Sequence, residues 1–479
     1  RGRVPDWAVP ARWTDPVYGV RGQDQGKQLY GGDLDGITDH LDHLERLGTD
    51  VLYLTPFFPA RSNHRYDAST FGQVDPVLGG DDALRRLTAE AHRRGMRVLG
   101  DITTNHTGDS HEWFVAARGS ESSPERDFYF WTTREDYVGW LGVTSLPKLN
   151  WDSAELRRRF LDDPDGAVRR WLGPAGDLDG WRVDVANMTG RHGRRDIYHQ
   201  VAAWTRDALA EARPDALLVA EHGHDYSADL PGDGWHGVMN YVGFTKPLWT
   251  WLCDPDDPPE FLGLPTAVPH LDGGRVVETM REFTSHIPWT ALTHSFNLIG
   301  SHDTTRARTL VDHDPRLSEV AAGLLLTMPS IPMVTYGDEI GMEGAYGEDG
   351  RRPMPWDERR WDRRLFAAYR SLVEARRGSV ALRRGGLRWV YAGRDVMVYL
   401  RESAEETALV HIARASHDPV VLDAGRLPGI AKGRTVFGRS PEISRDSVTL
   451  AALEPRVGVH VWTPARSRRG PRPGGERRR

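Results

Sequence analysis

The chain has 479 residues, which is long enough for one large domain and a small second one. Its composition is that of an ordinary globular protein, and a net charge of −6 gives no reason to expect nucleic acid or an anionic membrane as a partner. No apolar run reaches the length of about eighteen residues that a membrane-spanning helix needs. Cys253 is the only cysteine, so neither an internal disulfide nor a cysteine-based zinc site is expected.

Helix-like and strand-like segments alternate from about residue 36. A helix is predicted over 37–47, where apolar residues recur at helical spacing, and a buried strand follows over 51–58. Further strands are predicted at 97–102, 181–186, 217–221, 237–241, 296–300 and 331–337. Further helices are predicted at 81–94, 193–212, 274–284, 316–327 and 362–376. Because this alternation builds parallel βαβ units, an α/β fold with a (β/α)8 TIM barrel is favoured over an open sheet.

The chain divides into three parts by its patterns. The barrel is expected over 1–380, with an insertion at about 104–152 after the third barrel strand. Short alternating strands over 381–465 predict a small antiparallel β domain, and the Arg-rich segment 466–479 is typical of a disordered tail. A first barrel strand is not recognisable before Gly31, so either residues are missing or the barrel is one strand short.

Charged side chains stand at the ends of several predicted barrel strands, where TIM-barrel enzymes place their catalytic groups. They are Arg182 and Asp184, then Glu221, then His302 and Asp303. A charge within an apolar strand is costly unless it is paired or functional. Three convergent carboxylates suit glycoside hydrolysis, which needs one group at the anomeric carbon and another to protonate the leaving oxygen.

The neighbours of each carboxylate indicate its role. Arg182 lies two residues before Asp184 and faces the same way on a strand, so it should hold Asp184 ionised as a nucleophile. Glu221 has no adjacent cation in the sequence, and burial should raise its pKa as a general acid requires. Asp303 beside His302 is expected to stabilise positive charge in the transition state.

Four motifs resemble signatures of glycoside hydrolase family 13, the α-amylase superfamily: DITTNH, GWRVDVAN, VAEHGHD and GSHDTTR. The resemblance covers roughly residues 28–465. It implies that Asp184 forms a covalent glycosyl-enzyme intermediate, that Glu221 is the proton donor and then the base, and that Asp303 stabilises the transition state. It also implies sugar contacts for Tyr66, Asp67, His106, Arg182, His302 and Arg351.

Within that family the segments LPKLN (146–150), DVAN (184–187) and 224–241 are similar to the neopullulanase, cyclomaltodextrinase and maltogenic amylase group. This implies a retaining hydrolase of α-1,4-linked malto-oligosaccharides, with α-1,6 bonds, cyclodextrins or pullulan as further substrates. Met188 stands where that group usually has Glu, which leaves bond preference and transfer activity open. Asp101 is interpreted as a structural residue that bonds loop amides.

Two other functions remain open from the sequence: a transglycosylase or isomerase that makes α-glucosides, and a catalytically inactive binding or scaffold relative. No cofactor is expected to be required, and calcium, which some relatives bind, is not predicted. His222 and His224 have a spacing that invites a metal, but the sequence offers no third ligand. The expected partner is an α-glucan oligosaccharide and the expected location is the cytoplasm, while the oligomeric state is left undetermined.

Overall fold

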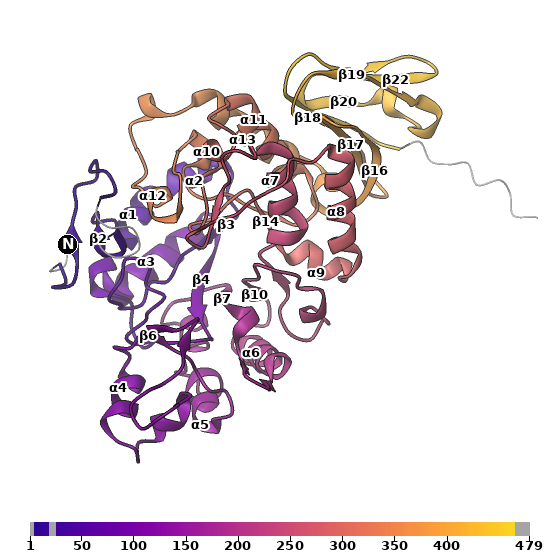
Figure 1. Cartoon of the computed structure of the whole chain (residues 1–479). Coiled ribbons are helices and arrows are strands. Elements are labelled where there is room, and N and C mark those ends of the chain that lie inside the picture. Colours follow the sequence, from indigo (N-terminus) through magenta and orange to yellow (C-terminus); the bar gives the residue numbers. More distant parts are fainter. Residues whose placement is uncertain (1–3, 19–24, 465–479) are drawn as a thin grey trace, which may run out of the picture.

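The computed structural model describes residues 4–18 and 25–464, and its centre is a ring of parallel strands (Figure 1). Seven strands alternate with helices, and they are the seven predicted from the sequence: β3 (Val51–Tyr53), β4 (Arg97–Thr103), β7 (Gly180–Asp184), β10 (Leu217–Ala220), β11 (Gly237–Val238), β14 (Phe296–Leu298) and β15 (Ile331–Met333). They lie side by side in chain order, with the bridge between Met239 and Phe296 joining β11 to β14. This is the arrangement of a (β/α)8 barrel.

The ring is open at one position. Within residues 4–18 and 25–464, no strand pairs with the outer edge of β3 or of β15. The N-terminal strands β1 (Val9–Pro10) and β2 (Gln28–Leu29) pair with each other instead. The gap that the sequence indicated at the first barrel strand is therefore present in this part of the chain.

Helices cover the outside of the strands. They are α1 (Leu34–Asp39), α2 (Leu41–Leu47), α3 (Gly80–Arg93), α6 (Tyr198–Ala212), α7 (Lys246–Leu252), α8 (Gly273–Ser285), α9 (Trp289–His294), α10 (Ala307–Leu310), α11 (Pro315–Thr327), α13 (Arg363–Gly378) and α14 (Val380–Arg384). In α3, Leu84, Leu87 and Ala91 are buried at the three- and four-residue spacing that puts them on one face of a helix. That face packs on the barrel and explains why this segment is helical.

Three predicted elements differ from the structure at their ends. The helix predicted at 193–212 begins only at Tyr198, because Arg191–His192 (β8) and Arg195–Asp196 (β9) form an antiparallel hairpin around Gly193, whose φ is 58°. The strand predicted at 51–58 ends at Tyr53, and its later apolar residues belong to a buried loop. The helix predicted at 37–47 is divided into α1 and α2 at His40.

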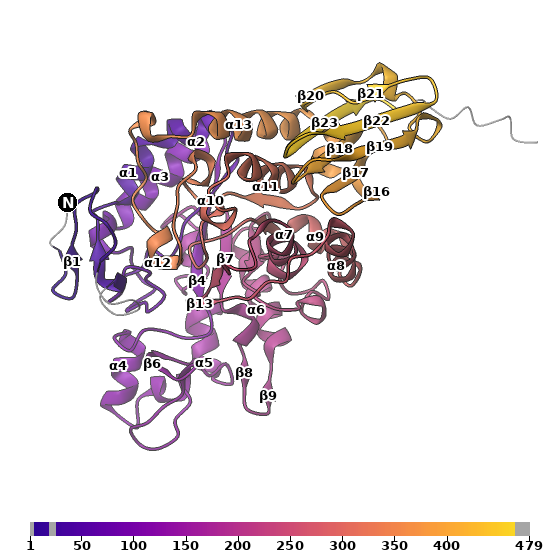
Figure 2. The ribbon, with the colours of Figure 1, turned by 45° about the horizontal axis from the view of Figure 1, so that its top comes forward.

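The segment between β4 and β7 projects from the barrel. It contains α4 (Glu112–Gly119), β5 (Gly139–Trp140), β6 (Val143–Pro147) and α5 (Ala154–Arg157). Figure 2 shows this segment beside the β8–β9 hairpin, on the opposite side of the barrel from the C-terminal strands. Two smaller elements lie among the other loops, the hairpin β12 (Glu260–Phe261) and β13 (Leu264–Pro265) and the short helix α12 (Gly347–Gly350).

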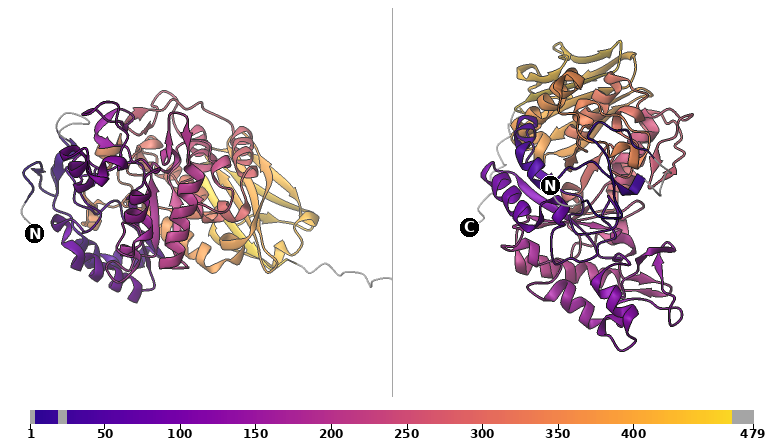
Figure 3. Two further views of the ribbon diagram at one scale, coloured as in Figure 1. Left: turned by 90° about the horizontal axis from the view of Figure 1, so that it is seen from below. Right: turned by 90° about the vertical axis from the view of Figure 1, so that its left-hand side faces the viewer.

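The C-terminal part is a small antiparallel β domain, as the sequence predicted. Its five-stranded sheet contains β16 (Gly386–Ala392), β17 (Val396–Glu402), β18 (Thr407–Ala413), β23 (Arg456–Trp462) and β20 (Arg434–Gly438). Its three-stranded sheet contains β19 (His417–Asp423), β22 (Ser447–Ala452) and β21 (Glu442–Ile443). Figure 3 shows this domain and the N-terminal strands at opposite ends of the molecule. The Arg-rich segment 466–479 lies outside the described residues.

The barrel and the β domain share one apolar core through α11, α13 and β23. Gly323 on α11 lies so close to β23 that a Cβ atom there would approach Val457 to 2.4 Å, so only glycine permits this contact. Among the described helices, none is both long and apolar enough to cross a membrane.

Candidate active site

Arg182 occupies the middle of the polar cluster at the ends of β4, β7 and β10. Its side chain is fully buried, and its Nη1 atom donates to Asp101 Oδ2 and to Asp184 Oδ1, each at 3.0 Å. Its Nη2 atom lies 3.1 Å from Glu221 Oε1. One guanidinium therefore holds three carboxylates from three adjacent strands, which brings the predicted nucleophile and acid together.

Asp101 supports this arginine from the neighbouring strand. Strand register places Asp101 beside Arg182, and the Asp101 carboxylate accepts hydrogen bonds from the hydroxyls of Tyr53 (2.6 Å) and Tyr66 (2.9 Å). The expectation that Asp101 bonds loop amides is therefore wrong: two tyrosines and an arginine satisfy it. Its position fixes Arg182, and through Arg182 it fixes Asp184.

The turn after Asp184 also positions Glu221. Val185 has φ 45° and ψ 36°, a left-handed conformation that costs free energy in a β-branched residue. In this conformation its backbone N–H donates to Glu221 Oε2 at 2.8 Å. Glu221 is thus held between Arg182 and the backbone that follows Asp184, and the strained turn sets the spacing of the two carboxylates.

Asp303 approaches the cluster from the loop after β14. Its side chain is 15% exposed, and its Oδ2 atom lies 3.2 Å from His302 Nε2. Its Oδ1 atom accepts a hydrogen bond from Arg351 Nη2 at 3.0 Å. His302 Nε2 is also 2.8 Å from the Tyr66 hydroxyl, so a chain of contacts links Asp303 to Arg182 through Tyr66.

Burial dominates the ionisation of this cluster. It raises the pKa of Glu221, as the sequence predicted, although Arg182 opposes the change. Burial and then the charge of Glu221 raise the pKa of Asp184 well above its ordinary value, against the effect of Arg182. The expectation that Arg182 holds Asp184 ionised is therefore wrong, because burial and Glu221 outweigh the arginine in their effect on this pKa. Two such neighbours titrate as a pair, so the protons belong to the pair and not to either residue.

Asp303 behaves differently from the other two carboxylates. Burial alone would raise its pKa, but His302, Arg351 and Arg182 together lower it below the ordinary value. Asp303 is therefore an anion at neutral pH. Burial lowers the pKa of His302 to about 4, so that imidazole is neutral there.

Two further predicted sugar contacts, His106 and Asp67, differ in whether their polar atoms are already hydrogen-bonded. His106 is buried, and its Nε2 atom has no hydrogen-bond partner within the described part of the chain. Its ring lies 5.9 Å from that of Trp140 in the insertion. The Asp67 carboxylate instead accepts hydrogen bonds from Arg61 N and the Ser62 hydroxyl, which stabilise its own loop.

Three residues of the site were assigned no role from the sequence. Tyr53 stands within an apolar strand, and Val185 looks like an ordinary strand residue. Lys148 lies in the LPKLN segment, where its buried ammonium donates to the carbonyl oxygen of Met188 at 2.9 Å and to the side chain of Asn105. Burial lowers the pKa of Lys148 to about 8. All three act through partners that are remote in sequence, so spacing could not find them.

One group of metal-ligating side chains lies next to the cluster. Among the described residues, His222, His224 and Asp229 bring one ligand atom each to within 4.8 Å of one another. The group begins at the residue after Glu221 and is separate from the carboxylates held by Arg182.

The chain is similar to several known proteins. A cyclomaltodextrinase from Bacillus sp is 32% identical over 393 residues, covering 80% of this chain and 65% of the relative. Neopullulanase 2 from Thermoactinomyces vulgaris is 33% identical over 405 residues, covering 82% of this chain and 63% of the relative. The chain thus spans about 65% of the length of these curated relatives.

A solved structure of similar size also matches. The cyclic α-maltosyl-(1→6)-maltose hydrolase from Arthrobacter globiformis, in complex with cyclic α-maltosyl-(1→6)-maltose, aligns with a TM-score of 0.79 and 28% identity, covering 95% of this chain and 93% of that one. The family model "Alpha amylase, catalytic domain" matches residues 16–363, most of the chain. The chain therefore belongs to the α-amylase family, glycoside hydrolase family 13.

Proposed function

We propose that this chain hydrolyses α-glucosidic bonds in malto-oligosaccharides with retention of configuration at the anomeric carbon. The observation that carries the proposal is the contact of Asp184 and Glu221 with Arg182, to which Asp303 is linked through His302 and Tyr66. Family membership supports the same chemistry. A binding or scaffold role gains no support, because the three carboxylates and their partners are all in place.

The reaction proceeds in two steps. In the first, an Asp184 oxygen forms a bond to the anomeric carbon while the glycosidic C–O bond breaks and Glu221 gives its proton to the departing oxygen. In the second, Glu221 takes a proton from water, the water oxygen bonds to the anomeric carbon, and the ester to Asp184 breaks. Asp303, an anion, stabilises the positive charge that develops on the sugar ring.

The pairing of Asp184 and Glu221 suits the first step. One shared proton is the stoichiometry that this step needs: an ionised nucleophile and a protonated acid. Catalysis places that proton on Glu221, next to the leaving oxygen. Arg182, which contacts both groups, keeps the remaining charge near the anomeric carbon.

Sugar recognition is proposed for the polar groups around the carboxylates. Tyr66, His302 and His106 offer a hydroxyl and two neutral imidazoles, and the free Nε2 atom of His106 suits a sugar hydroxyl. Arg351 reaches Asp303 from the loop that carries α12 and is placed for an outer contact. The Asp67 carboxylate contributes once its loop bonds are exchanged for a sugar hydroxyl.

The substrate class rests on the relatives. Their names, cyclomaltodextrinase, neopullulanase and cyclic α-maltosyl-(1→6)-maltose hydrolase, point to α-1,4-linked oligosaccharides, with α-1,6 bonds as a second type. Action inside the cell is part of the same proposal, supported by a relative named intracellular maltogenic amylase from Bacillus subtilis at 30% identity.

The experiment combines a substrate panel with two variants. Maltose, isomaltose, maltotriose, a cyclodextrin and pullulan are incubated with the purified chain, and the products are identified. We expect shorter maltosaccharides of retained anomeric configuration. Longer or rearranged sugars as main products would instead establish the transferase or isomerase alternative.

Asp184→Ala and Glu221→Gln separate the two roles. Both should lose at least about 10³-fold in kcat/KM on maltotriose. Glu221→Gln should recover its first step on an aryl α-glucoside whose leaving group needs no proton, while Asp184→Ala should not. Glu343→Gln is the matched control, because Glu343 is exposed and pairs with His313 away from the carboxylate cluster. Near-normal hydrolysis by Asp184→Ala would show that Asp184 is not the nucleophile.

A further inference from the structure

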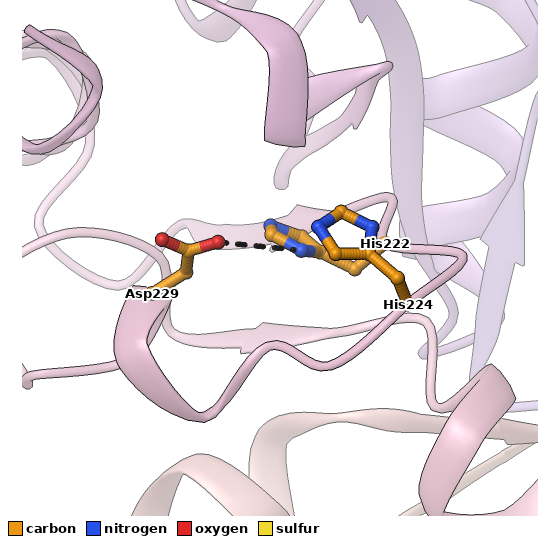
Figure 4. Close-up of side chains that lie close together, drawn as sticks. All are labelled: His222, His224 and Asp229. Atoms are coloured by element: carbon orange, nitrogen blue, oxygen red, sulfur yellow. Dashed lines mark ion pairs between the residues drawn. The ribbon is translucent and has the colours of Figure 1, made fainter. Parts of the chain in front are cut away.

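The loop after Glu221 folds back so that three potential metal ligands face one another. His222 and His224 follow β10, and Asp229 ends the short 3-10 turn Ser227–Asp229. Figure 4 shows the Asp229 carboxylate directed at the ring of His222, with the ring of His224 beside it. The ring centroids of the two histidines are 5.4 Å apart. The third ligand that the sequence lacked is supplied by this fold of the loop.

The Nδ1 atom of His222, at the centre of this group, is available for a ligand. Its side chain is fully buried, and its Nδ1 atom has no hydrogen-bond partner among the described residues. The nearest acceptor, Asp229 Oδ2, is 3.7 Å away, which is too long for a hydrogen bond. A buried polar atom without a partner is costly in a protein interior, so this atom points to a missing ligand.

The opposite side of the His222 ring is already fixed. Its Nε2 atom is 2.9 Å from the hydroxyl oxygen of Tyr198, and the same oxygen accepts a hydrogen bond from Trp235 Nε1. Metal-binding histidines commonly donate their second ring N–H to an oxygen in this way, which orients the ring. If Nε2 carries the proton, Nδ1 presents a lone pair towards Asp229.

Asp229 is oriented in a similar manner. Its Oδ1 atom forms an ion pair with Arg191 Nη2 at 3.0 Å, which leaves Oδ2 on the side of His222. His224 is exposed; its ring lies beside that of His222, and its Nδ1 atom is 3.5 Å from Asn187 Nδ2.

We propose that His222, His224 and Asp229 form a binding site for one divalent transition-metal ion, of which zinc fits the ligand set best. Two imidazoles and one carboxylate suit zinc, whereas calcium and magnesium prefer oxygen ligands. Ligand atoms around tetrahedral zinc lie about 3.3–3.5 Å apart, given bonds of about 2.0–2.2 Å. The 3.7 Å between His222 and Asp229 is close to this, and the exposed His224 brings a ligand atom to within 4.8 Å of the other two.

The ion would cross-link the start and the end of the loop 222–229, which directly follows Glu221 in the chain. Three protein ligands leave the fourth position to water. Because the ion binds the folded loop and not the unfolded chain, binding should raise the melting temperature of the protein. This inference is independent of the glycosidase proposal, since it rests on residues outside the carboxylate cluster.

The test uses the full chain, freed of metal by a chelator and dialysed. Zinc chloride is titrated in a calorimeter, and the melting temperature is followed with and without zinc. We expect one ion per chain and a higher melting temperature. Calcium and magnesium chloride should produce neither effect. Absence of saturable zinc binding to the wild-type chain would overturn the proposal.

Variants separate this site from adventitious binding by surface histidines. His224→Ala and Asp229→Asn should each weaken zinc binding by at least tenfold, and exposed His224 can be replaced without disturbing the core. His313→Ala, an exposed histidine elsewhere, should bind zinc like the wild type. Arg191→Met removes the ion pair that orients Asp229 but no ligand, so it should weaken zinc binding less than Asp229→Asn does. Equal affinity in His224→Ala, or equal loss in Arg191→Met and Asp229→Asn, would contradict the assignment.

Discussion

Two buried arginines in this molecule are stabilised by different partners. Arg182 at the barrel mouth is surrounded by the carboxylates of Asp101, Asp184 and Glu221. Arg401, at the junction with the β domain, makes no ion pair in the described part of the chain and donates to the carbonyl oxygens of Thr327 (2.6 Å) and Gly385 (2.8 Å).

The two environments change the guanidinium in opposite directions. Burial alone would lower the pKa of Arg182, but Asp101 and Glu221 raise it well above the ordinary value. Burial and the nearby Arg376 lower the pKa of Arg401 to about 9. Carbonyl dipoles are sufficient to hold a buried cation for structural purposes, whereas a cluster of carboxylates holds negative charge ready for chemistry.

The largest expected effect follows from removing the cation of the barrel mouth. In Arg182→Met, Asp184 and Glu221 lose their common partner and should take up additional protons, so the ionised nucleophile is lost. We expect kcat/KM on maltotriose to fall by at least about 10³-fold, since a single electrostatic contact to a transition state is worth about 10²–10³-fold. Activity within tenfold of the wild type would show that Arg182 does not organise the site. Circular dichroism checks that the variant is folded.

Removing Arg401 should lower the stability of the fold and leave activity nearly unchanged. Arg401→Met leaves buried carbonyl oxygens without donors, at a cost of about 1–3 kcal/mol for each group that water cannot reach. We expect the free energy of unfolding to fall by about 3 kcal/mol in urea titrations, with kcat/KM within about twofold of the wild type. An unchanged unfolding midpoint would mean that the carbonyl contacts of Arg401 contribute nothing.

Acid should destabilise the fold through buried neutral histidines. Burial lowers the pKa of His106, His111 and His222 to about 3 each, below the ordinary value near 6.5. The unfolded chain therefore binds protons below pH 6.5 that the folded chain refuses until about pH 3. Each histidine contributes stability above pH 6.5 that is lost as the pH falls, at up to about 1.4 kcal/mol per pH unit.

His111→Asn isolates one of these contributions. The His111 side chain accepts a hydrogen bond from Trp113 N at the start of α4, and Asn also serves well at that position. Between pH 6.5 and 5 the wild type should lose about 2 kcal/mol more than this variant in urea titrations. Parallel pH profiles for the two proteins would contradict the assignment of His111 as a buried neutral group.

The smallest effect is expected for an arginine that is not buried. Arg388 on β16 pairs with Glu402 on β17 at 2.7 Å, and both side chains are exposed. In Glu402→Gln the free energy of unfolding should change by less than about 1 kcal/mol, because water screens such pairs. A larger loss of unfolding free energy would show that an exposed arginine ion pair also stabilises the fold. Burial would then not be what separates Arg388 from Arg182 and Arg401.

The order of the elements and the types of residue at the ends of the strands could be read from the amino-acid sequence. Apolar periodicity located all seven described barrel strands, because a strand buried on both faces is a continuous apolar run. Charges that interrupt such runs, as at Asp184 and Glu221, are rare enough to mark a functional site. The antiparallel β domain followed from the change of period after about residue 380.

Folding establishes which of these groups touch one another, and the structure was needed to see it. It assigned Asp101 to two tyrosines and Arg182, turned Val185 towards Glu221, and brought Asp229 to His222. It also reversed the expected pKa shift of Asp184, since burial and a neighbouring carboxylate outweigh one cation. A local sequence pattern gives the spacing of apolar residues and the positions of charges. The distance between residues that are remote in sequence, and the dielectric between them, are set by how the chain packs.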